Sequence, residues 1–170
     1  LGSIPKVYYV SPDGIDALDK GASENNPFKT IKYAMDYILA DQGARAPATV
    51  FVKTGEYKEI LPISIPANVA LVGDELRSTR IMPASGYETS NMFYVRNGCG
   101  IRNVTLQGLT GGLGAVNAFG TRRPTGGAFV SLDPGTGPDD TSVWITSRST
   151  YVQNVTTIGT GCVGCKIDGN

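Results

Sequence analysis

Short β-prone runs follow one another along most of the chain, separated by Gly, Pro and Asn residues that favour turns. A recurrence at intervals of roughly ten residues is typical of antiparallel sandwiches and of β-solenoids. The pattern therefore predicts an all-β fold and leaves the architecture open. The runs lie at residues 7–10, 49–53, 63–65, 69–72, 80–82, 92–95, 101–106, 128–132, 143–146, 152–157 and 163–167.

Residues 27–40 carry the helical pattern of the chain. Apolar residues recur there at spacings of three and four and form one face: Phe28, Ile31, Ala34, Met35 and Ile38. Asn25 and Asn26 are capping residue types, and Pro27 suits a first helical turn. The sequence therefore predicts an amphipathic α-helix over residues 27–40.

An internal repeat favours the solenoid. A shift of 51 residues places 92–95 over 143–146, 101–105 over 152–156, and Gly108 over Gly159. Such small units cannot bury their own faces, so the repeat indicates stacked coils, with residues 109–127 and 133–142 as projecting loops. We expect Val104 and Val155 to face inward. Asn103 and Asn154 belong to Asn-x-Thr sequences, and we expect their side chains to stack at the turns.

The composition excludes several kinds of chemistry. The chain has no His among its 170 residues, which removes imidazole-dependent triads and His-ligated metal sites. Its 15 basic residues equal its 15 acidic ones, so neither nucleic acid nor an anionic membrane is an expected partner. No apolar stretch approaches the ~20 residues of a membrane span, and no leader pattern is visible, so membrane insertion is not expected either.

Three segments resemble the opening of right-handed parallel β-helix proteins of the pectin-lyase-like type: residues 8–14 (YYVSPDG), 26–34 (NPFKTIKYA) and 50–59 (VFVKTGEYKE). The resemblance implies a right-handed parallel β-helix with an N-terminal amphipathic capping α-helix. Residues 50–59 would form the first coil, and residues 69–74 with 79–81 the next. It also implies a single structural domain, in which residues 1–46 form the N-terminal strand, loop and capping helix and residues 47–170 form the coils with their inserted loops.

A later stretch, residues 133–138, 141–146 and 151–155, is similar to large virion structural proteins of T4-like phages that infect marine cyanobacteria. This resemblance implies a tail fibre, spike or adhesin located in the virion. Its expected partners are other virion proteins and host cell-surface polysaccharide, and its expected state is a homotrimer. The alternative is a polysaccharide-degrading enzyme, a lyase or glycan esterase, which requires a cleft of convergent Asp, Arg or Lys.

Two charged pairs are candidate ligand-binding residues. Arg122 and Arg123 lie in the Gly-rich segment 109–127, and a guanidinium can bind the carboxylate of an acidic sugar through two hydrogen bonds. Asp139 and Asp140 are the obvious carboxylate pair, although neighbours on a strand point to opposite faces, whereas glycosidases need a defined separation. Solvated loop charges are the alternative for both pairs, and we predict no catalytic residue.

No cofactor is expected, and calcium is the alternative. Asp13, Asp16, Asp19 and Glu24 are possible oxygen ligands, but their spacing lacks the order of an EF-hand, and a polar loop leading to the helix explains them as well. Cys162 and Cys165 have a C-x-x-C spacing, yet zinc needs four ligands and Cys99 is the one other cysteine. We therefore expect small apolar Cys side chains inside a coil and no metal site.

The last predicted strand, residues 163–167, has no following helix or Pro-rich loop to cover it. A parallel solenoid that is open at one end exposes unpaired N–H and C=O groups, which can pair with further strands. We expect further coils of a longer protein, or partner chains, to cover this end.

Overall fold

The computed structural model describes residues 6–42, 47–96, 98–116, 118–132 and 150–166. Within these ranges the chain consists mainly of β-strands, which confirms the all-β prediction, and it contains one α-helix, α1 (Ile31–Gln42). The strands are β1 (Lys6–Val10), β2 (Ala48–Val52), β3 (Gly55–Glu59), β4 (Ile63–Ser64), β5 (Val69–Gly73), β6 (Thr79–Pro83), β7 (Phe93–Val95), β8 (Gly100–Thr110), β9 (Leu113–Val116), β10 (Arg122–Pro124), β11 (Ala128–Leu132), β12 (Tyr151–Thr160) and β13 (Val163–Lys166).

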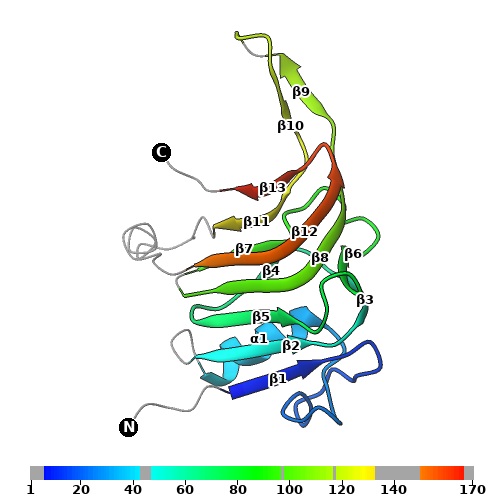
Figure 1. Ribbon diagram of the computed structural model, residues 1–170, viewed down its shortest axis with the longest axis vertical. Coiled ribbons are helices and arrows are strands. Elements are labelled where there is room, and N and C mark those ends of the chain that lie inside the picture. Colours follow the sequence, from blue (N-terminus) through cyan, green and yellow to red (C-terminus); the bar gives the residue numbers. More distant parts are fainter. Residues whose placement is uncertain (1–5, 43–46, 97, 117, 133–149, 167–170) are drawn as a thin grey trace.

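Most strands lie in parallel ladders that together form a curled sheet (Figure 1). One ladder has the order β1-β2-β5-β8-β12, and a second joins β3 and β6 to the later part of β8. The third ladder has the order β4-β7-β11-β13. Strand β3 is missing from the β-prone runs of the sequence, and its polar residues alternate with the buried Tyr57 and Glu59.

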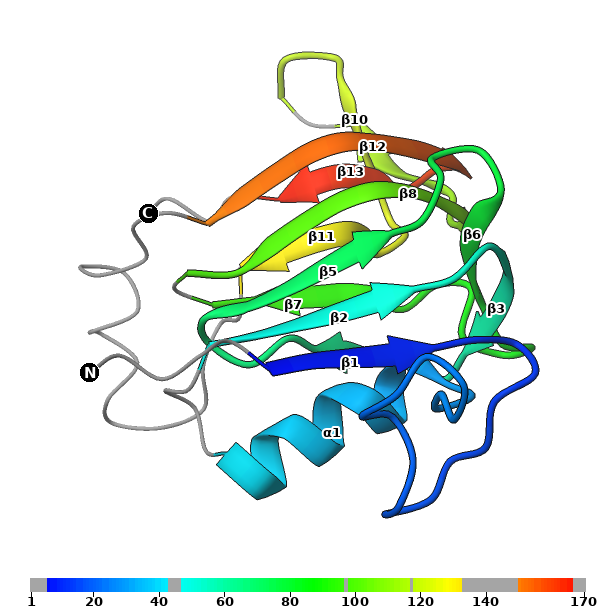
Figure 2. The same cartoon turned by 60° about the horizontal axis from the view of Figure 1, so that its bottom comes forward.

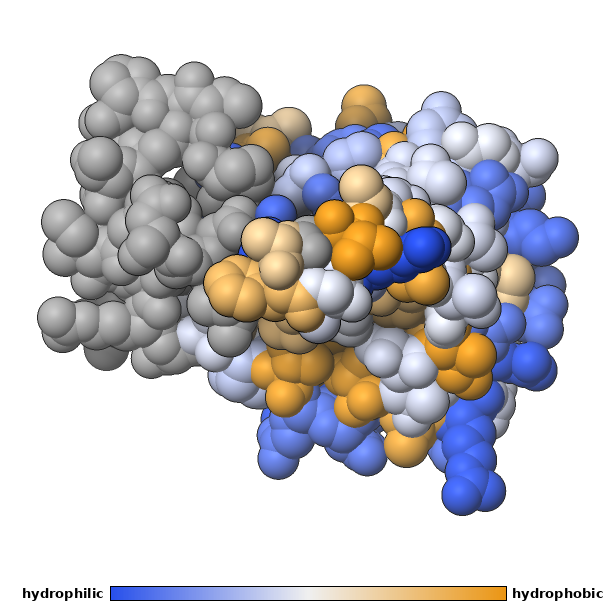
Figure 3. Space-filling model, turned by 90° about the horizontal axis from the view of Figure 1, so that it is seen from above, coloured by the Kyte–Doolittle hydropathy of each residue, from blue (hydrophilic) through white to orange (hydrophobic). Residues whose placement is uncertain are grey.

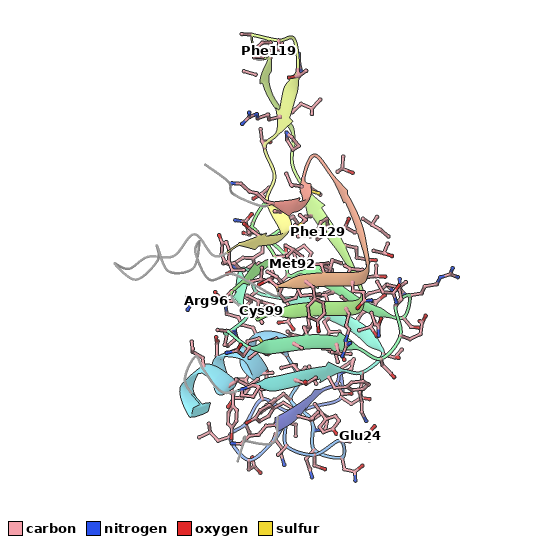
Figure 4. The ribbon with its side chains drawn as sticks, turned by 60° about the vertical axis from the view of Figure 1, so that its left-hand side comes forward. Glu24, Met92, Arg96, Cys99, Phe119 and Phe129 are labelled. Carbon is pink, nitrogen blue, oxygen red and sulfur yellow. The ribbon has the colours of Figure 1, made fainter. Side chains whose placement is uncertain are left out.

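The core forms because residues in register stack into the interior. Tyr8 lies opposite Val50, Val50 opposite Leu71, and Leu71 opposite Ile101, and all four side chains are buried. One continuous apolar cluster extends from Tyr8 to Val130, so the segments 1–46 and 47–170 share a core within the described residues. Met92 and Phe129 lie inside the stack of strands (Figure 4).

Helix α1 packs beneath β1 and β2, at the end of the molecule opposite β12 and β13 (Figure 2). Its apolar face agrees with the prediction, because all five predicted side chains are almost completely buried: Phe28, Ile31, Ala34, Met35 and Ile38. The predicted start at residue 27 is wrong. Phe28 is extended instead: its amide donates to the Tyr9 carbonyl (2.8 Å), and its carbonyl accepts the Ser11 amide (2.9 Å).

The helix begins four residues later because other residues cap it. The Thr30 hydroxyl accepts the Tyr33 amide (3.2 Å), as expected of an N-cap side chain. The Asp16 carboxylate accepts the amides of Lys29 (2.8 Å) and Thr30 (3.0 Å) and the Thr30 hydroxyl (2.8 Å). The cap therefore comes from Thr30 and from a residue 14 positions earlier, and not from Asn25 or Asn26.

The predicted repeat is confirmed where the structure describes both copies. Strand β12 lies directly on β8, with Ile101 opposite Val152 and Val104 opposite Val155. Val104 is buried, and Val155 is half-buried against the core. The other half of the repeat, residues 143–146, lies outside the described residues.

Asn103 and Asn154 occupy the bends of β8 and β12. Both have a positive φ (58° and 52°), a conformation that Asn adopts more readily than most residues. The Asn154 side-chain amide donates to the Asn103 side-chain oxygen (2.8 Å), which confirms the predicted stacking. Asn103 thus lets β8 pair with β5 before the bend and with β6 after it.

Replacing Asn103 with Ala is expected to lower the free energy of unfolding by about 1–2 kcal/mol, because Ala pays a steric cost at positive φ. Asn103→Gly is the matched control: it loses the same side-chain hydrogen bond but tolerates the backbone conformation. Urea denaturation of both variants measures the difference. Equal losses for Ala and Gly would show that the bend does not depend on the conformation of Asn103.

Candidate functional site

A β-hairpin projects beyond the ladders at the end of the molecule opposite α1 (Figure 1). It is formed by β9 and β10, which pair antiparallel between the end of β8 and the start of β11. The projecting loop expected at residues 109–127 therefore contains two paired strands. The hydrophobic pattern missed this hairpin because both of its faces are largely exposed, so it has no buried side to create an alternation.

The hairpin exposes both apolar and cationic side chains. Phe119 lies at its tip and is 89% exposed (Figure 4), while Leu113 and Val116 of β9 are 63% and 53% exposed. Arg122 and Arg123 of β10 are exposed as well. Seen from above, apolar and strongly hydrophilic groups meet over this end (Figure 3). Exposed aromatic and guanidinium side chains on one element are a combination found in binding surfaces.

Three glycines fix the root of the hairpin, where the chain leaves β8, enters β11 and turns from β12 to β13. The Gly126 amide donates to the Gly161 carbonyl (2.9 Å). A Cβ at Gly111 would lie 2.3 Å from the Gly161 oxygen, and a Cβ at Gly126 would lie 2.6 Å from the Thr110 oxygen. The backbones pack so closely here that side chains do not fit, which holds the root of the hairpin against β12 and β13.

A cavity of about 300 Å³, here called the root cavity, lies at this junction. It is lined by Arg123 and Pro124 of the hairpin, Gly126 and Ala128 before and in β11, Val163 and Lys166 of β13, and Asn91. Of these lining residues, Arg123 is the one that the sequence predicted as a ligand-binding candidate. Asn91 and Lys166 are 75 positions apart in the sequence. Both line the root cavity because β7, β11 and β13 stack in register, with Val130 of β11 opposite both Phe93 and Cys165.

The structure places half of the predicted ligand-binding residues. Arg122 and Arg123 are neighbours on β10, and Arg123 lines the root cavity whereas Arg122 does not. Asp139 and Asp140 lie outside the described residues, so whether the two pairs meet stays untested.

Three of the four candidate calcium ligands make other contacts. Asp16 holds the start of α1, Asp19 forms an ion pair with Lys20 (3.3 Å), and Glu24 forms one with Lys53 (3.2 Å). Within the described ranges, no three Cys, Asp or Glu side chains gather in a way that could hold a metal ion. These carboxylates therefore give no support to the calcium alternative.

The cysteines differ in their surroundings. Cys99 is buried as expected, and burial raises the pKa of its thiol, which keeps it protonated at neutral pH. Cys162 is half-buried against the core, as expected of a small apolar side chain. Cys165 is exposed, so the expectation is wrong for this residue. It lies on β13 opposite the buried Val130 of β11. Among the described strands β13 pairs with β11 alone, so no further strand covers Cys165.

A second cavity, of about 280 Å³, lies beside the start of α1 and contains a buried carboxyl group. Glu59 of β3 is 1% exposed and accepts the amides of Ile31 (2.6 Å) and Lys32 (3.4 Å). Burial raises the pKa of Glu59, although both amide hydrogen bonds act in the opposite direction. Burial also raises the pKa of the adjacent Tyr57, whose hydroxyl lies 2.6 Å from the Lys53 carbonyl oxygen. We interpret this group as a structural cap of α1.

Replacing Glu59 with Gln is expected to flatten the dependence of stability on pH. The pKa of Glu59 lies above 4.5 in the folded chain, so folding takes up a proton between that ordinary value and the raised one. Wild-type stability therefore falls as the pH rises through this window, and the neutral amide removes this loss while its oxygen still accepts the Ile31 amide. Urea denaturation from pH 4 to pH 8 measures the effect, and parallel curves for the two proteins would contradict it.

Comparison with known proteins identifies a family and no individual relative. No curated protein and no solved structure matches the chain. No helix within the described ranges has the length and apolar character needed to span a membrane. A family described as "Protein of unknown function (DUF1565)" matches residues 13–169, almost the whole chain, including α1, the strands β2 to β13 and the root cavity. The chain is a member of this family.

Proposed function

We propose that the chain is a non-enzymatic binding module, a right-handed parallel β-helix that presents the hairpin β9–β10 to cell-surface glycan. The observation that carries the proposal is the projecting hairpin, which exposes Phe119 at its tip and Arg122 and Arg123 on β10. Aromatic rings pack against the apolar faces of sugars, and guanidinium groups hydrogen-bond their polar substituents.

The order of the strands supports the β-helix. Strands β2, β3 and β4 follow one another in the chain, and the next three strands pair with them in the same order. Strand β5 pairs with β2, β6 with β3 and β7 with β4, all in parallel. The hairpin is an insertion in this arrangement, between β8 and β11. The family is associated with β-helix-like proteins. In solenoids, such insertions are commonly the binding sites.

A binding assay tests the glycan proposal. The purified chain is applied to immobilised neutral and acidic polysaccharides: dextran, mannan, polygalacturonate and dextran sulfate. Phe119→Ser is expected to weaken binding about tenfold, the loss of roughly 1.4 kcal/mol of contact energy at an aromatic anchor. Leu18→Ser is the matched control, because Leu18 is also exposed (78%) but lies in the loop near α1. Equal effects of the two substitutions, or no binding to any polysaccharide, would contradict the proposal.

We also propose that the module belongs to a virion fibre or spike, in contact with other virion proteins and assembled as a trimer. An exposed sheet edge supports contact with another chain: among the described strands β12 pairs with β8 alone, and Tyr151, Val152 and Ile158 are each 42% exposed or more. Light scattering of the purified chain tests the assembly. A mass equal to three chains is expected, and a monomer at high concentration would contradict the trimer.

The alternative proposal is a polysaccharide-degrading enzyme. Glu59 is a buried carboxyl group that lines a cavity, and its oxygens already accept two amides of helix α1. Binding is therefore the better-supported function. Release of unsaturated or reducing sugar ends from polygalacturonate or alginate, abolished by Asp139→Ala or Asp140→Ala, would favour the enzyme.

A further inference from the structure

The charges of the described chain are divided between its two ends. In residues 89–132 and 150–166 no described residue is Asp or Glu, and the charged side chains are all basic: Arg96, Arg102, Arg122, Arg123 and Lys166. The described acidic residues lie between Asp13 and Glu88, in the part that includes α1 and β1–β6. Among the described residues, the hairpin end is therefore cationic.

Two of these cations meet at the root cavity. Arg123 reaches it from β10, and Lys166 reaches it from β13. The cavity volume of about 300 Å³ is at the lower end of the range for small-molecule sites, about 300–1,000 Å³. This size suits a single sugar unit or a similar small group and is too small for a stretch of macromolecule.

Asn91 and Ala128, here called the floor of the root cavity, are held in place by hydrogen bonds. The Asn91 side-chain oxygen accepts the Ala128 amide (2.8 Å), and its side-chain nitrogen donates to the Tyr94 hydroxyl (2.8 Å). Glu88, the acidic residue closest to this region in the described sequence, directs its carboxylate to the Gly86 amide (2.9 Å). The site therefore combines a rigid floor with two long cationic side chains, so binding requires little ordering of the backbone.

We propose that the root cavity binds a carboxylate or sulfate group carried by a saccharide unit. The inference rests on the proposed glycan-binding function and assigns its ligand class and position. Arg123 offers a planar pair of donors that matches either anion, and Lys166 adds a second positive charge. Nucleic acid fits less well, because its recognition uses a long basic stripe, whereas here two cations converge on one cavity.

Arg122 and Arg123 provide a matched pair of variants. The two residues are adjacent, exposed and equally charged, but Arg123 alone of the two lines the root cavity. Isothermal titration of the 170-residue chain with oligogalacturonate and with dextran sulfate oligosaccharide measures the affinity. Arg123→Ala and Lys166→Ala are each expected to raise the Kd about tenfold or more, the effect of losing a charge-assisted hydrogen bond. Arg122→Ala is expected to raise it less than about threefold, as for a surface charge away from the ligand.

Each other outcome overturns the inference in a recognisable way. Equal losses for Arg122→Ala and Arg123→Ala would show diffuse attraction to the hairpin instead of a site. Inorganic sulfate that binds as tightly as dextran sulfate oligosaccharide would show a free-anion site, and single-stranded DNA that binds as tightly would show a nucleic-acid surface. Binding to neutral dextran or mannan alone would refute the anionic ligand and leave the proposed glycan-binding function standing. Binding to no glycan would refute both.

Discussion

Replacing Ile31 with Asp is expected to lower the free energy of unfolding by about 3 kcal/mol or more, because a carboxylate would be buried without a cationic partner. Ile31 is 0% exposed and lies at the start of α1, beside the buried Glu59 that accepts its amide. A second carboxyl group at this place adds repulsion to the cost of burial. Thermal and urea denaturation measure the loss, which corresponds to roughly 6 °C or more in Tm at about 2–4 °C per kcal/mol for a domain of this size.

Leu39→Asp is the matched control for this substitution. It makes the same kind of change in the same helix, but Leu39 is 47% exposed, so its expected effect is within about 1 kcal/mol. If both variants unfold at the same denaturant concentration as the wild type, the packing of α1 against β1 and β2 does not stabilise the chain.

Replacing Gly127 with Ala is expected to cost about 2–3 kcal/mol and to displace the hairpin. A Cβ at this position would lie 2.3 Å from the Ser90 carbonyl oxygen and 2.6 Å from the Asn91 nitrogen. These are backbone atoms and cannot rotate away, so the strand entry itself must shift. Because Asn91 and Ala128 line the root cavity, the same change is expected to weaken binding there.

Gly112→Ala separates this effect from a general intolerance of the Gly-rich segment. Gly112 lies at the start of the same hairpin, and its Cβ would meet only the Thr125 hydroxyl oxygen at 3.4 Å, an ordinary contact. Its stability and affinity are expected to equal those of the wild type. Wild-type behaviour of Gly127→Ala would mean that the close approach of β11 to residues 90–91 is absent in solution.

The sequence predicted those parts of the fold that depend on local pattern or on repetition. The spacing of Ile31, Ala34 and Ile38 located the buried face of α1, and the 51-residue repeat predicted the contact of β8 with β12. The start of α1 was wrong because Asp16 and Glu59, distant in sequence, determine it. Capping residue types at positions 25 and 26 could not reveal those partners.

The candidate site was predicted in part. Arg122 and Arg123 stood out as a charged pair in a Gly-rich segment, but the hairpin itself lacked a buried face and gave no strand pattern. The root cavity joins segments that only the stacking of strands brings together, so its position was beyond prediction. The division of charge, by contrast, is visible in the sequence, since no Asp or Glu occurs between Glu88 and Asp133, and the overall balance of charges obscured it.

Amide chemical-shift mapping with dextran sulfate oligosaccharide tests most directly the claim that the hairpin end is the binding surface. We expect the largest shifts at the amides that line the root cavity, those of Arg123, Gly126, Ala128 and Val163, with smaller shifts toward Phe119. The amides beside the second cavity, at Thr30 and Lys58, are expected to remain unchanged. Shifts concentrated at that second cavity, with none at the hairpin end, would contradict the claim that the hairpin end binds the saccharide.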